Sequence, residues 1–364
     1  MTWTPSDERW MRRALDLAQK GQLTTWPNPM VGCVIVEDEV IIGEGWHRRF
    51  GEGHAEVNAL GTISMDTDLS RATAYVTLEP CSHHGKTPPC SDLLVSRGIG
   101  RVVVATQDPN SMVAGRGLAR LTEAGIEVIS GCLAKKAEEL NSKFFFAMTE
   151  DRPWITLKWA QSRDGFVDPD ERAAEGRGGH LLTGAASARH THALRATHDG
   201  ILVGMRTWLV DRPKLSTRHV PGNSPKRFIL TSGTSPKPEH APTGQPNITL
   251  VVPHTQLREP VLDTWRNDGY AVLGIQGLTF SHQWWKDFRA QTGVGACMVE
   301  GGAQVAGSVL SSDVWDEVHV LTASVQLDSG LKAPAQPEGD PATTVDLGSD
   351  VLFVWKAHRM NTPC

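Results

Sequence analysis

The sequence predicts an α/β protein with two domains, and three observations support this. Short apolar segments of strand length alternate with amphipathic segments of helix length. The chain of 364 residues is longer than one typical hydrophobic core requires. A new series of predicted strands and helices begins after the break at Asp151-Arg-Pro153. We therefore expect one domain over residues 1–150 and a second over 151–364.

The first half begins with a predicted helix over residues 7–19, which Ser6 can cap. A hairpin follows, with strands over 30–36 and 40–42. The remaining elements are a helix over 54–60, a strand over 74–78, a helix over 92–97, a strand over 101–106, a helix over 117–124, a strand over 126–129 and a helix over 135–146. This order predicts a mixed sheet with helices on both faces.

The second half repeats neither the order nor the spacing of the first. Its predicted strands cover 154–159, 200–203, 227–230, 249–252, 271–274, 297–300, 317–321 and 351–354, and its predicted helices cover 185–197 and 304–311. Residues 231–246 are rich in Pro, Gly and Ser and indicate a loop. Residues 207–218 follow a buried strand and indicate a second loop, dense in hydrogen-bonding groups.

The composition excludes several classes of protein. A net charge of −5 argues against a nucleic-acid partner held mainly through phosphates. No apolar run reaches membrane-spanning length, and the first residues do not form a signal peptide. The six cysteines show no disulfide framework. We expect a cytoplasmic protein with a small-molecule substrate, no membrane or nucleic-acid partner, and assembly into a homo-oligomer.

The strongest chemical pattern joins His54-Ala-Glu56 to Glu79-Pro-Cys81 and Cys90. One imidazole and two thiolates can hold Zn²⁺ and leave its fourth position open to water. Glu56 is a carboxylate that need not bind the metal and can move protons. This set is typical of zinc hydrolytic deaminases, although eight residues separate the two cysteines where the usual pattern has two.

A weaker pattern lies in the second half, where Val299-Glu-Gly-Gly-Ala303 ends a predicted strand and leads into a helix. Glycines at such a junction allow a phosphate to approach the free N–H groups of the helix. A simple turn would show the same residues, so this pattern alone does not decide between the two.

Many segments resemble the bifunctional deaminase–reductase family of riboflavin biosynthesis. The resemblance rests on Pro27-Asn-Pro-Met-Val-Gly32, His54-Ala-Glu-Val-Asn-Ala59, residues 77–90, Asp108-Pro-Asn110, Val113-Ala-Gly-Arg-Gly117, Leu157-Lys-Trp-Ala-Gln-Ser162, Asp164-Gly165, Leu194-Arg195, Ile201-Leu-Val-Gly204, Asp211-Arg-Pro213 and Val299-Glu-Gly-Gly302. It implies a cytidine-deaminase-like α/β/α sandwich with a mixed sheet, followed by an α/β domain similar to dihydrofolate reductase. It also implies Zn²⁺ and NADPH as cofactors, and a diaminopyrimidinone carrying a phosphoribosylamino group as the substrate.

The resemblance further implies the role of individual residues. In the deaminase, His54, Cys81 and Cys90 would bind zinc, Glu56 would shuttle protons, and the substrate would contact Asn28, His83, His84, Lys86 and Thr87. In the reductase, the substrate would contact Arg195, Leu215, Arg218 and Glu300. The cofactor would contact Gln161, Thr207, Asp211, Gly302, Ala303, Gln304, Val305, Ala306, Gly307 and Ser308. Asp211 is also the candidate for positioning or protonating the opened sugar, and Lys158 has no definite role.

Two alternatives stay open. Residues 178–183 lack the Trp-Ile pair that is usual in the family, so the aromatic cofactor contact is either replaced by Leu181 or absent. Arg163 also replaces a smaller residue. These departures allow a second domain without catalytic activity. A nucleic-acid base deaminase is the other alternative, but it predicts a basic surface and closely spaced cysteines.

Overall fold

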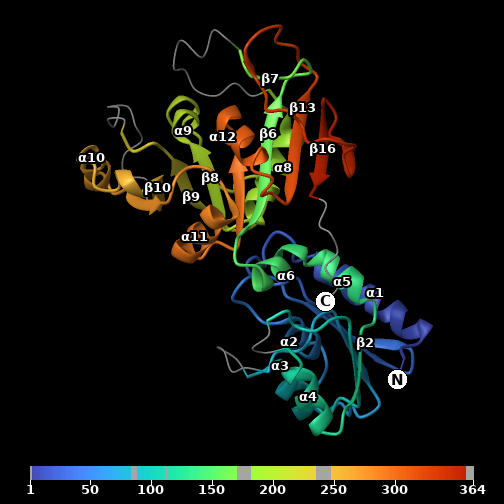
Figure 1. Ribbon diagram of the computed structural model, residues 1–364. Helices are drawn as coiled ribbons and strands as arrows, with labels where there is room; N and C mark the ends of the chain where they lie inside the picture. The colour runs from blue at the N-terminus through green and yellow to red at the C-terminus, as the bar shows by residue number, and fades with distance from the viewer. Residues whose placement is uncertain (1, 83–87, 111–113, 170–181, 235–246, 358–364) are drawn as a thin grey trace. The chain divides into compact units, whose positions relative to one another are not determined.

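The computed structural model describes residues 2–82, 88–110, 114–169, 182–234 and 247–357. The chain divides into two compact units, Met1–Glu150 and Asp151–Cys364 (Figure 1). The fold class that the sequence predicts is confirmed, because each unit builds a sheet with helices on both faces. None of the described helices is long and apolar enough to cross a membrane.

The first unit is a three-layered α/β/α sandwich. Its sheet has the strand order β2-β1-β3-β4-β5, in which β1 pairs antiparallel with β2 and β3, and the other pairs are parallel. The strands are β1 (Gly32–Glu37), β2 (Val40–Trp46), β3 (Thr73–Val76), β4 (Arg101–Val104) and β5 (Glu127–Ser130). The helices are α1 (Pro5–Gln19), α2 (Ala55–Leu60), α3 (Cys90–Ser96), α4 (Arg116–Glu123), α5 (Ala134–Leu140) and α6 (Ser142–Thr149).

Two apolar clusters hold these three layers together. On one face of the sheet, Met11 and Leu17 of α1 pack against alternate residues of β1 and β3. On the other face, α2, α3 and α4 contribute Ala59, Leu94 and Leu121 to a second cluster. Successive strand residues point to opposite faces, so nearly every residue of β1 is buried.

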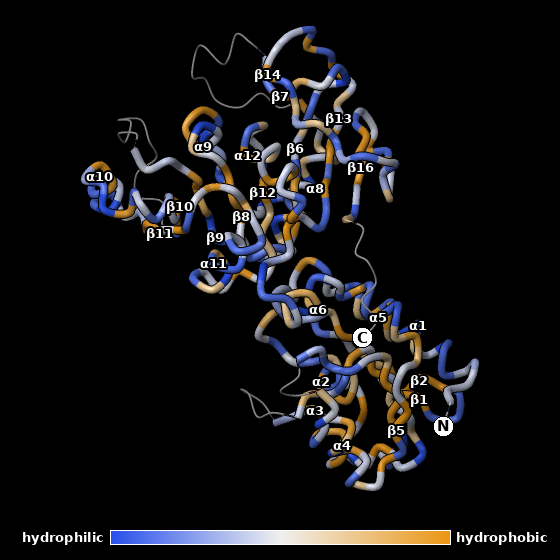
Figure 2. Tube along the Cα trace, viewed as in Figure 1, coloured by the Kyte–Doolittle hydropathy of each residue, from blue (hydrophilic) through white to orange (hydrophobic). Residues whose placement is uncertain are grey.

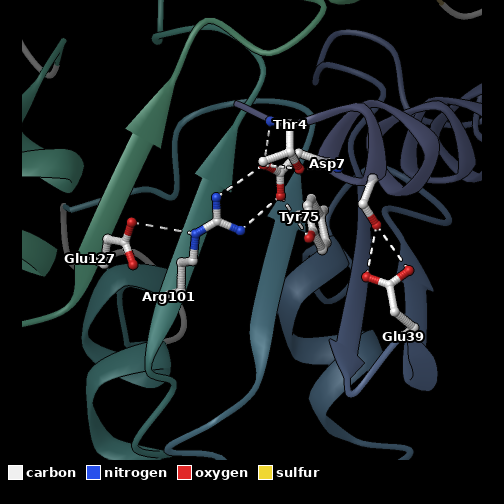
Figure 3. Close-up of polar contacts among 7 residues, drawn as sticks. Thr4, Asp7, Glu39, Tyr75, Arg101 and Glu127 are labelled. Carbon is white, nitrogen blue, oxygen red and sulfur yellow. Dashed lines mark hydrogen bonds and ion pairs between the residues drawn. The ribbon is translucent and has the colours of Figure 1, made fainter. Parts of the chain in front are cut away.

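The N-terminus of α1 corrects the predicted cap (Figure 3). Thr4, and not Ser6, is the N-cap: its hydroxyl accepts the Asp7 N–H at 3.2 Å, and the Asp7 carboxylate accepts the Thr4 N–H at 2.8 Å. Ser6 instead donates to Glu39 at 2.8 Å. The prediction failed because Thr4 and Ser6, on either side of Pro5, both suit a cap, and only Thr4 has an acidic side chain three positions later.

Asp7 also joins α1 to the sheet through a buried network (Figure 3). Its carboxylate accepts bonds from Arg101 of β4 at 2.7 and 3.0 Å and from the Tyr75 hydroxyl of β3 at 2.9 Å. Burial by itself would raise the pKa of Asp7, but the bonds from Arg101, Thr4 and Tyr75 hold this pKa well below its usual range.

The helix predicted over 135–146 is in fact two helices, α5 and α6, separated at Asn141. The Asn141 side chain accepts the Met30 N–H and donates to the Met30 carbonyl, both at 2.8 Å. This pair of bonds holds the chain at the break. Since Met30 lies 111 positions away, local sequence patterns could not reveal the break.

The second unit is built on a nine-stranded sheet in the order β11-β10-β9-β8-β12-β6-β13-β16-β15. The pairs from β11 through β13 are parallel, and those of β13 with β16 and of β16 with β15 are antiparallel. The strands are β6 (Trp154–Gln161), β8 (Gly200–Gly204), β9 (Lys226–Leu230), β10 (Ile248–Pro253), β11 (Ala271–Ile275), β12 (Ala296–Glu300), β13 (Glu317–Ala323), β15 (Thr343–Asp346) and β16 (Asp350–Lys356), beside a small pair of β7 (Phe166–Asp168) and β14 (Leu331–Lys332).

The helices of the second unit cover both faces of this sheet. They are α8 (Ala185–Ala196), α9 (Met205–Asp211), α10 (Val261–Asn267), α11 (His282–Thr292) and α12 (Ala303–Leu310), with a short 3₁₀ turn at His254–Gln256. Helices α11 and α12 pack on one face, whereas α8, α9 and α10 pack on the other. Apolar residues concentrate along inner strands such as β12 (Figure 2).

Three helices of this unit correct the sequence prediction. The stretch predicted as a loop over 207–218 begins inside α9, and the prediction omits α10 and α11. Ser281 caps α11 by accepting the Trp284 N–H at 3.3 Å. In α11 the buried residues are Trp284, Trp285 and Phe288, whose spacing is helical, but aromatic residues such as these are also common in strands.

Candidate functional site

Three metal-ligand side chains of the first unit converge on one point. His54 is the N-cap residue of α2, Cys81 follows β3, and Cys90 is the first residue of α3. The His54 Nδ1 atom lies 3.6 Å from the Cys81 Sγ and 3.3 Å from the Cys90 Sγ. All three atoms lie within 4.8 Å of one another. The predicted ligand set is therefore brought together.

The spacing of these atoms fits tetrahedral zinc. Bonds of about 2.3 Å to sulfur and about 2.0 Å to nitrogen, at a tetrahedral angle, separate the nitrogen from each sulfur by about 3.5 Å. Hydrogen bonding to Cys90, and also to His54, lowers the pKa of Cys81 although burial opposes the shift. A lowered pKa favours the thiolate, which is the form that binds metals.

A cavity of about 250 Å³ opens beside this cluster. Glu56 lines it together with His54 and Cys81, and its side chain is buried. Burial raises the pKa of Glu56 to about 7. A carboxyl group with this pKa exchanges protons readily near neutral pH, as a general acid–base catalyst must.

Asn28 lies in the cavity, and His47 is a cavity residue that the sequence did not reveal. The Asn28 amide nitrogen is 3.2 Å from the His47 Nε2, and the His47 Nδ1 is 3.1 Å from the Gly53 carbonyl. Burial lowers the pKa of His47, which favours a neutral ring that donates to Gly53 and accepts from Asn28. No sequence signal pointed to His47, because the predicted strand ended at residue 42 and a single histidine matches no motif.

Glu79, which the sequence analysis noted only as part of the Glu-Pro-Cys motif, organises a second wall of the cavity. Its buried carboxylate accepts backbone N–H groups of Asp108 at 3.2 Å, Gly115 at 2.9 Å and Gly117 at 2.8 Å. These bonds hold the backbone at Asp108, Gly115 and Gly117, and Asp108 and Asn110 line the cavity. Five further residues complete the lining: Pro29, Val31, Leu78, Phe144 and Met148.

Strand β6 of the second unit separates two chemical environments. Lys158 is the register partner of Glu300 on β12, and its Nζ lies 3.8 Å from the Glu300 Oε1. The residues on either side of Lys158, Leu157 and Trp159, face the opposite apolar cluster with α11 and α12. Gln161 shares their side, since its Oε1 accepts the Trp159 indole N–H at 2.9 Å.

Arg195 of α8 pairs with Glu300 through two bonds, at 2.7 and 2.8 Å. Burial acts to raise the pKa of Glu300, yet the charges of Arg195 and Lys158 keep it below its usual value. Arg195 also donates to the Ser216 carbonyl at 3.0 Å. Its charge is thus already balanced by Glu300, whereas Arg218, two residues beyond Ser216, has an exposed side chain.

The predicted glycine-rich junction lies beside Thr207. Gly302 has a φ of 73°, and a Cβ built there would approach the Thr207 hydroxyl to 2.9 Å. Gly204 at the end of β8 would similarly approach Val305 to 3.0 Å. The structure therefore brings together the ends of β8 and β12 and the start of α12, which carry the predicted cofactor contacts.

The other predicted residues of this half differ in exposure. Asp211 is exposed at the last position of α9, and the side chain of Leu215 is buried in the apolar cluster under α9. Leu215 could therefore offer a ligand only its backbone. His83, His84, Lys86, Thr87 and Leu181 lie outside the described residues.

Comparison with known proteins gives matches over nearly the whole chain. Residues 4–106 match the cytidine and deoxycytidylate deaminase zinc-binding region, and residues 153–348 match the RibD C-terminal domain. The riboflavin biosynthesis protein RibD of Bacillus amyloliquefaciens is 38% identical over 355 residues, which cover 92% of this chain and 88% of that protein. The chain belongs to the RibD family.

Further RibD proteins agree with this assignment. The protein of Escherichia coli strain K12 is 38% identical over 90% of both chains. The solved structure of Acinetobacter baumannii RibD superposes with a TM-score of 0.80 at 33% identity, covering 97% of this chain and 99% of that one. The protein is thus a bifunctional enzyme of riboflavin biosynthesis that combines a deaminase with a reductase and uses zinc and NADPH.

Proposed function

We propose that the protein catalyses two consecutive reactions. The first removes the 2-amino group of 2,5-diamino-6-(5-phosphoribosylamino)pyrimidin-4-one by hydrolysis and gives 5-amino-6-(5-phosphoribosylamino)uracil. The second reduces the ribosyl group to a ribityl chain. A solved Thermotoga maritima protein with a TM-score of 0.78 and 30% identity carries both activities in its name, as a diaminohydroxyphosphoribosylaminopyrimidine deaminase and 5-amino-6-(5-phosphoribosylamino)uracil reductase.

The convergence of His54, Cys81 and Cys90 is the observation that carries this proposal. These three residues hold the zinc, which when bound lowers the pKa of water and makes it a nucleophile at neutral pH. Glu56 accepts the proton of that water and returns it to the departing amine. Its burial in the same cavity supports this role, because the proton then has little access to bulk solvent.

The other deaminase residues bind the substrate. The Asn28 amide, oriented by His47, contacts the pyrimidine. His83, His84, Lys86 and Thr87 contact the phosphoribosyl group, a proposal that rests on the sequence alone. Cationic and hydrogen-bonding side chains suit a phosphate, and a free base would not need them.

In the reductase, Gln161, Thr207, Asp211 and residues 302–308 contact NADPH, which supplies the hydride. The free N–H groups at the start of α12 support this proposal, because they favour a phosphate. Arg195, Leu215, Arg218 and Glu300 form the substrate side. Arg195 already bonds to Glu300 and to the Ser216 carbonyl, which supports Arg218 as the better phosphate ligand of the two arginines.

The reduction also needs a proton source. Hydride transfer to C1 of the sugar leaves an oxygen that must be protonated. We assign this step, or the positioning of the opened sugar, to Asp211. Its exposed place at the end of α9, close in sequence to Thr207, supports the assignment.

We further assign the deaminase to residues 1–150 and the reductase to residues 151–364, in a cytoplasmic homo-oligomer. The two compact units and the two matched regions support this division. All five described cysteines are free, as expected in a reducing compartment. Similarity to RibD proteins over both halves favours this two-step enzyme over a nucleic-acid deaminase or a non-catalytic second domain.

The test is to incubate the purified, zinc-loaded protein with the diaminopyrimidine substrate, with and without NADPH. Ammonia release measures the first reaction, and loss of the NADPH absorbance measures the second. We expect ammonia in both samples and NADPH oxidation after it. Absence of ammonia would refute the first assignment. Ammonia without NADPH oxidation would refute the second and favour a non-catalytic second unit.

A further inference from the structure

Helix α6 forms an apolar wall of the deaminase cavity. Phe144 and Met148 line the cavity from successive turns of this helix, as residues four positions apart do. Phe144 is 9% exposed and Met148 is 43% exposed. Phe144 therefore lies deep in the wall and Met148 lies at its rim. The zinc chemistry and the proton shuttle use neither residue.

The Asn141 side chain ties another part of the cavity lining to the start of this helix. Asn141, which is 4% exposed and precedes α6 directly, makes both of its bonds to the backbone of Met30. Met30 follows Asn28 and Pro29, which line the cavity. The spacing between the Asn28 wall and the Phe144 wall thus depends on this two-bond clamp.

The two kinds of wall suit a flat heterocycle. Side chains such as Asn28, Asp108 and Asn110 offer hydrogen bonds to the edge of a ring. Phe144 is the phenylalanine among the described residues that line the cavity. Its ring can pack against the ring of a heterocycle, because aromatic rings attract one another at centroid distances of about 4.5–7 Å. Met148 has a flexible thioether that adapts to irregular surfaces.

We propose that α6 is the substrate-recognition wall of the deaminase. Phe144 packs against the pyrimidine ring, Met148 covers the substrate at the cavity mouth, and Asn141 positions both. The proposal rests on the deaminase function proposed above and adds to it residues that bind the substrate. Phe144 and Met148 act in binding, whereas Asn141 is a positioning residue.

The first experiment compares Phe144→Ala and Phe144→Leu with the parent. Loss of a base–aromatic stack weakens binding by about ten- to a hundredfold. We expect KM for ammonia release, and the Kd of the aminouracil product measured by titration calorimetry, to rise by this factor in Phe144→Ala. Phe144→Leu keeps an apolar side chain of similar size and should lose most of the same affinity, while remaining folded.

The zinc content of each variant reports whether the first unit is intact. Phe145→Leu is the matched control, because this ring contacts Phe144 edge-on without lining the cavity, and it should change the Kd far less than Phe144→Leu does. An unchanged product Kd in a zinc-loaded Phe144→Leu variant would overturn the proposal. Failure of the parent to release ammonia would instead refute the proposed function, and the product Kd would still test the wall.

The second experiment replaces the clamp by Asn141→Ala. Displacement of the wall should lower kcat/KM for ammonia release about ten- to a hundredfold, and raise the product Kd, at a temperature well below Tm. A purely structural role would lower Tm and leave the product Kd at the parent value, which would overturn the assignment of Asn141. Asn141→Asp retains the acceptor for the Met30 N–H, so its kcat/KM and product Kd should lie between those of the parent and of Asn141→Ala.

Discussion

The two candidate sites of this enzyme are built in different ways. In the first unit, three ligand atoms from His54, Cys81 and Cys90 lie within 4.8 Å of one another in a defined cavity. In the second unit, the candidate residues are spread over the ends of several strands and helices, and some of them bond to each other, as Arg195 does to Glu300. A metal needs a few side-chain atoms at fixed distances, and such atoms leave a readable sequence motif. A dinucleotide is held largely by backbone groups and shape, which leave a weaker one.

The sharpest test of this contrast is Cys81→Ser. A hydroxyl is a poor zinc ligand, so we expect zinc to be largely lost and ammonia release to be abolished. Metal analysis of the purified variant checks the first effect, and an ammonia assay checks the second. Cys132→Ser, at a buried cysteine of another cluster, is the control that should keep its zinc. Full zinc retention in Cys81→Ser would refute the ligand assignment.

Glu56→Gln should separate metal binding from catalysis. The amide cannot accept a proton, and general acid–base groups contribute about 10²–10⁴-fold to the rate. We expect ammonia release to fall by at least about a hundredfold while zinc content stays at the parent level. Reduction of 5-amino-6-(5-phosphoribosylamino)uracil by NADPH serves as the internal control and should not change. Near-normal ammonia release by Glu56→Gln would refute the assignment of Glu56 as the proton shuttle.

Glu300→Gln addresses the candidate residues that bond to each other in the second unit. It leaves the buried Arg195 and Lys158 without their counter-charge, which costs about 3–5 kcal/mol of unfolding free energy. NADPH oxidation should also be lost, whereas ammonia release should persist. Denaturant unfolding measures the first effect. A Glu300→Gln, Arg195→Gln double variant should recover part of the stability, and if it is less stable still, uncompensated charge is not the cause.

Asp7 makes a pH-dependent contribution to the first unit alone. Because its folded-state pKa is held below the usual value of about 3.9, its stabilisation is fully present above that pH. It is lost as pH falls from about 4 towards the folded-state pKa. Asp7→Asn should cost about 1.5–3 kcal/mol at neutral pH and flatten the loss of stability below pH 4. Denaturation curves at pH 7, 5, 4 and 3 would show this, and an unchanged slope would contradict it.

The smallest expected effect belongs to Asp211→Asn. One hydrogen bond to a charged group is worth about 1.5 kcal/mol, so NADPH oxidation should slow about tenfold. Zinc content and ammonia release should stay at the parent values, as Asp211 belongs to the second unit. Oxidation at the parent rate would show that Asp211 is only the last residue of α9.

The sequence predicted those parts of the fold that local patterns determine. The β1–β2 hairpin and most strands of both sheets follow from short runs of residues, and the grouping of His54, Cys81 and Cys90 follows from short motifs that could be read separately. The break at Asn141 could not be predicted, since its cause is Met30. The same holds for the polar buried face of α8, where Arg195 is stabilised by a carboxylate 105 positions away. His47 escaped because a single histidine after a strand carries no motif.

The two faces of strand β6 carry residues of different chemistry, so the function of the strand depends on its register. Lys158 faces Glu300, while Trp159 and Gln161 face the side of α11 and α12. A shift by one residue exchanges the two faces of a strand completely. A single inserted or deleted residue within β6 would therefore direct the lysine into the apolar cluster and a tryptophan towards Arg195. Substitutions within β6 therefore preserve the two faces of the strand, whereas an insertion or deletion exchanges them.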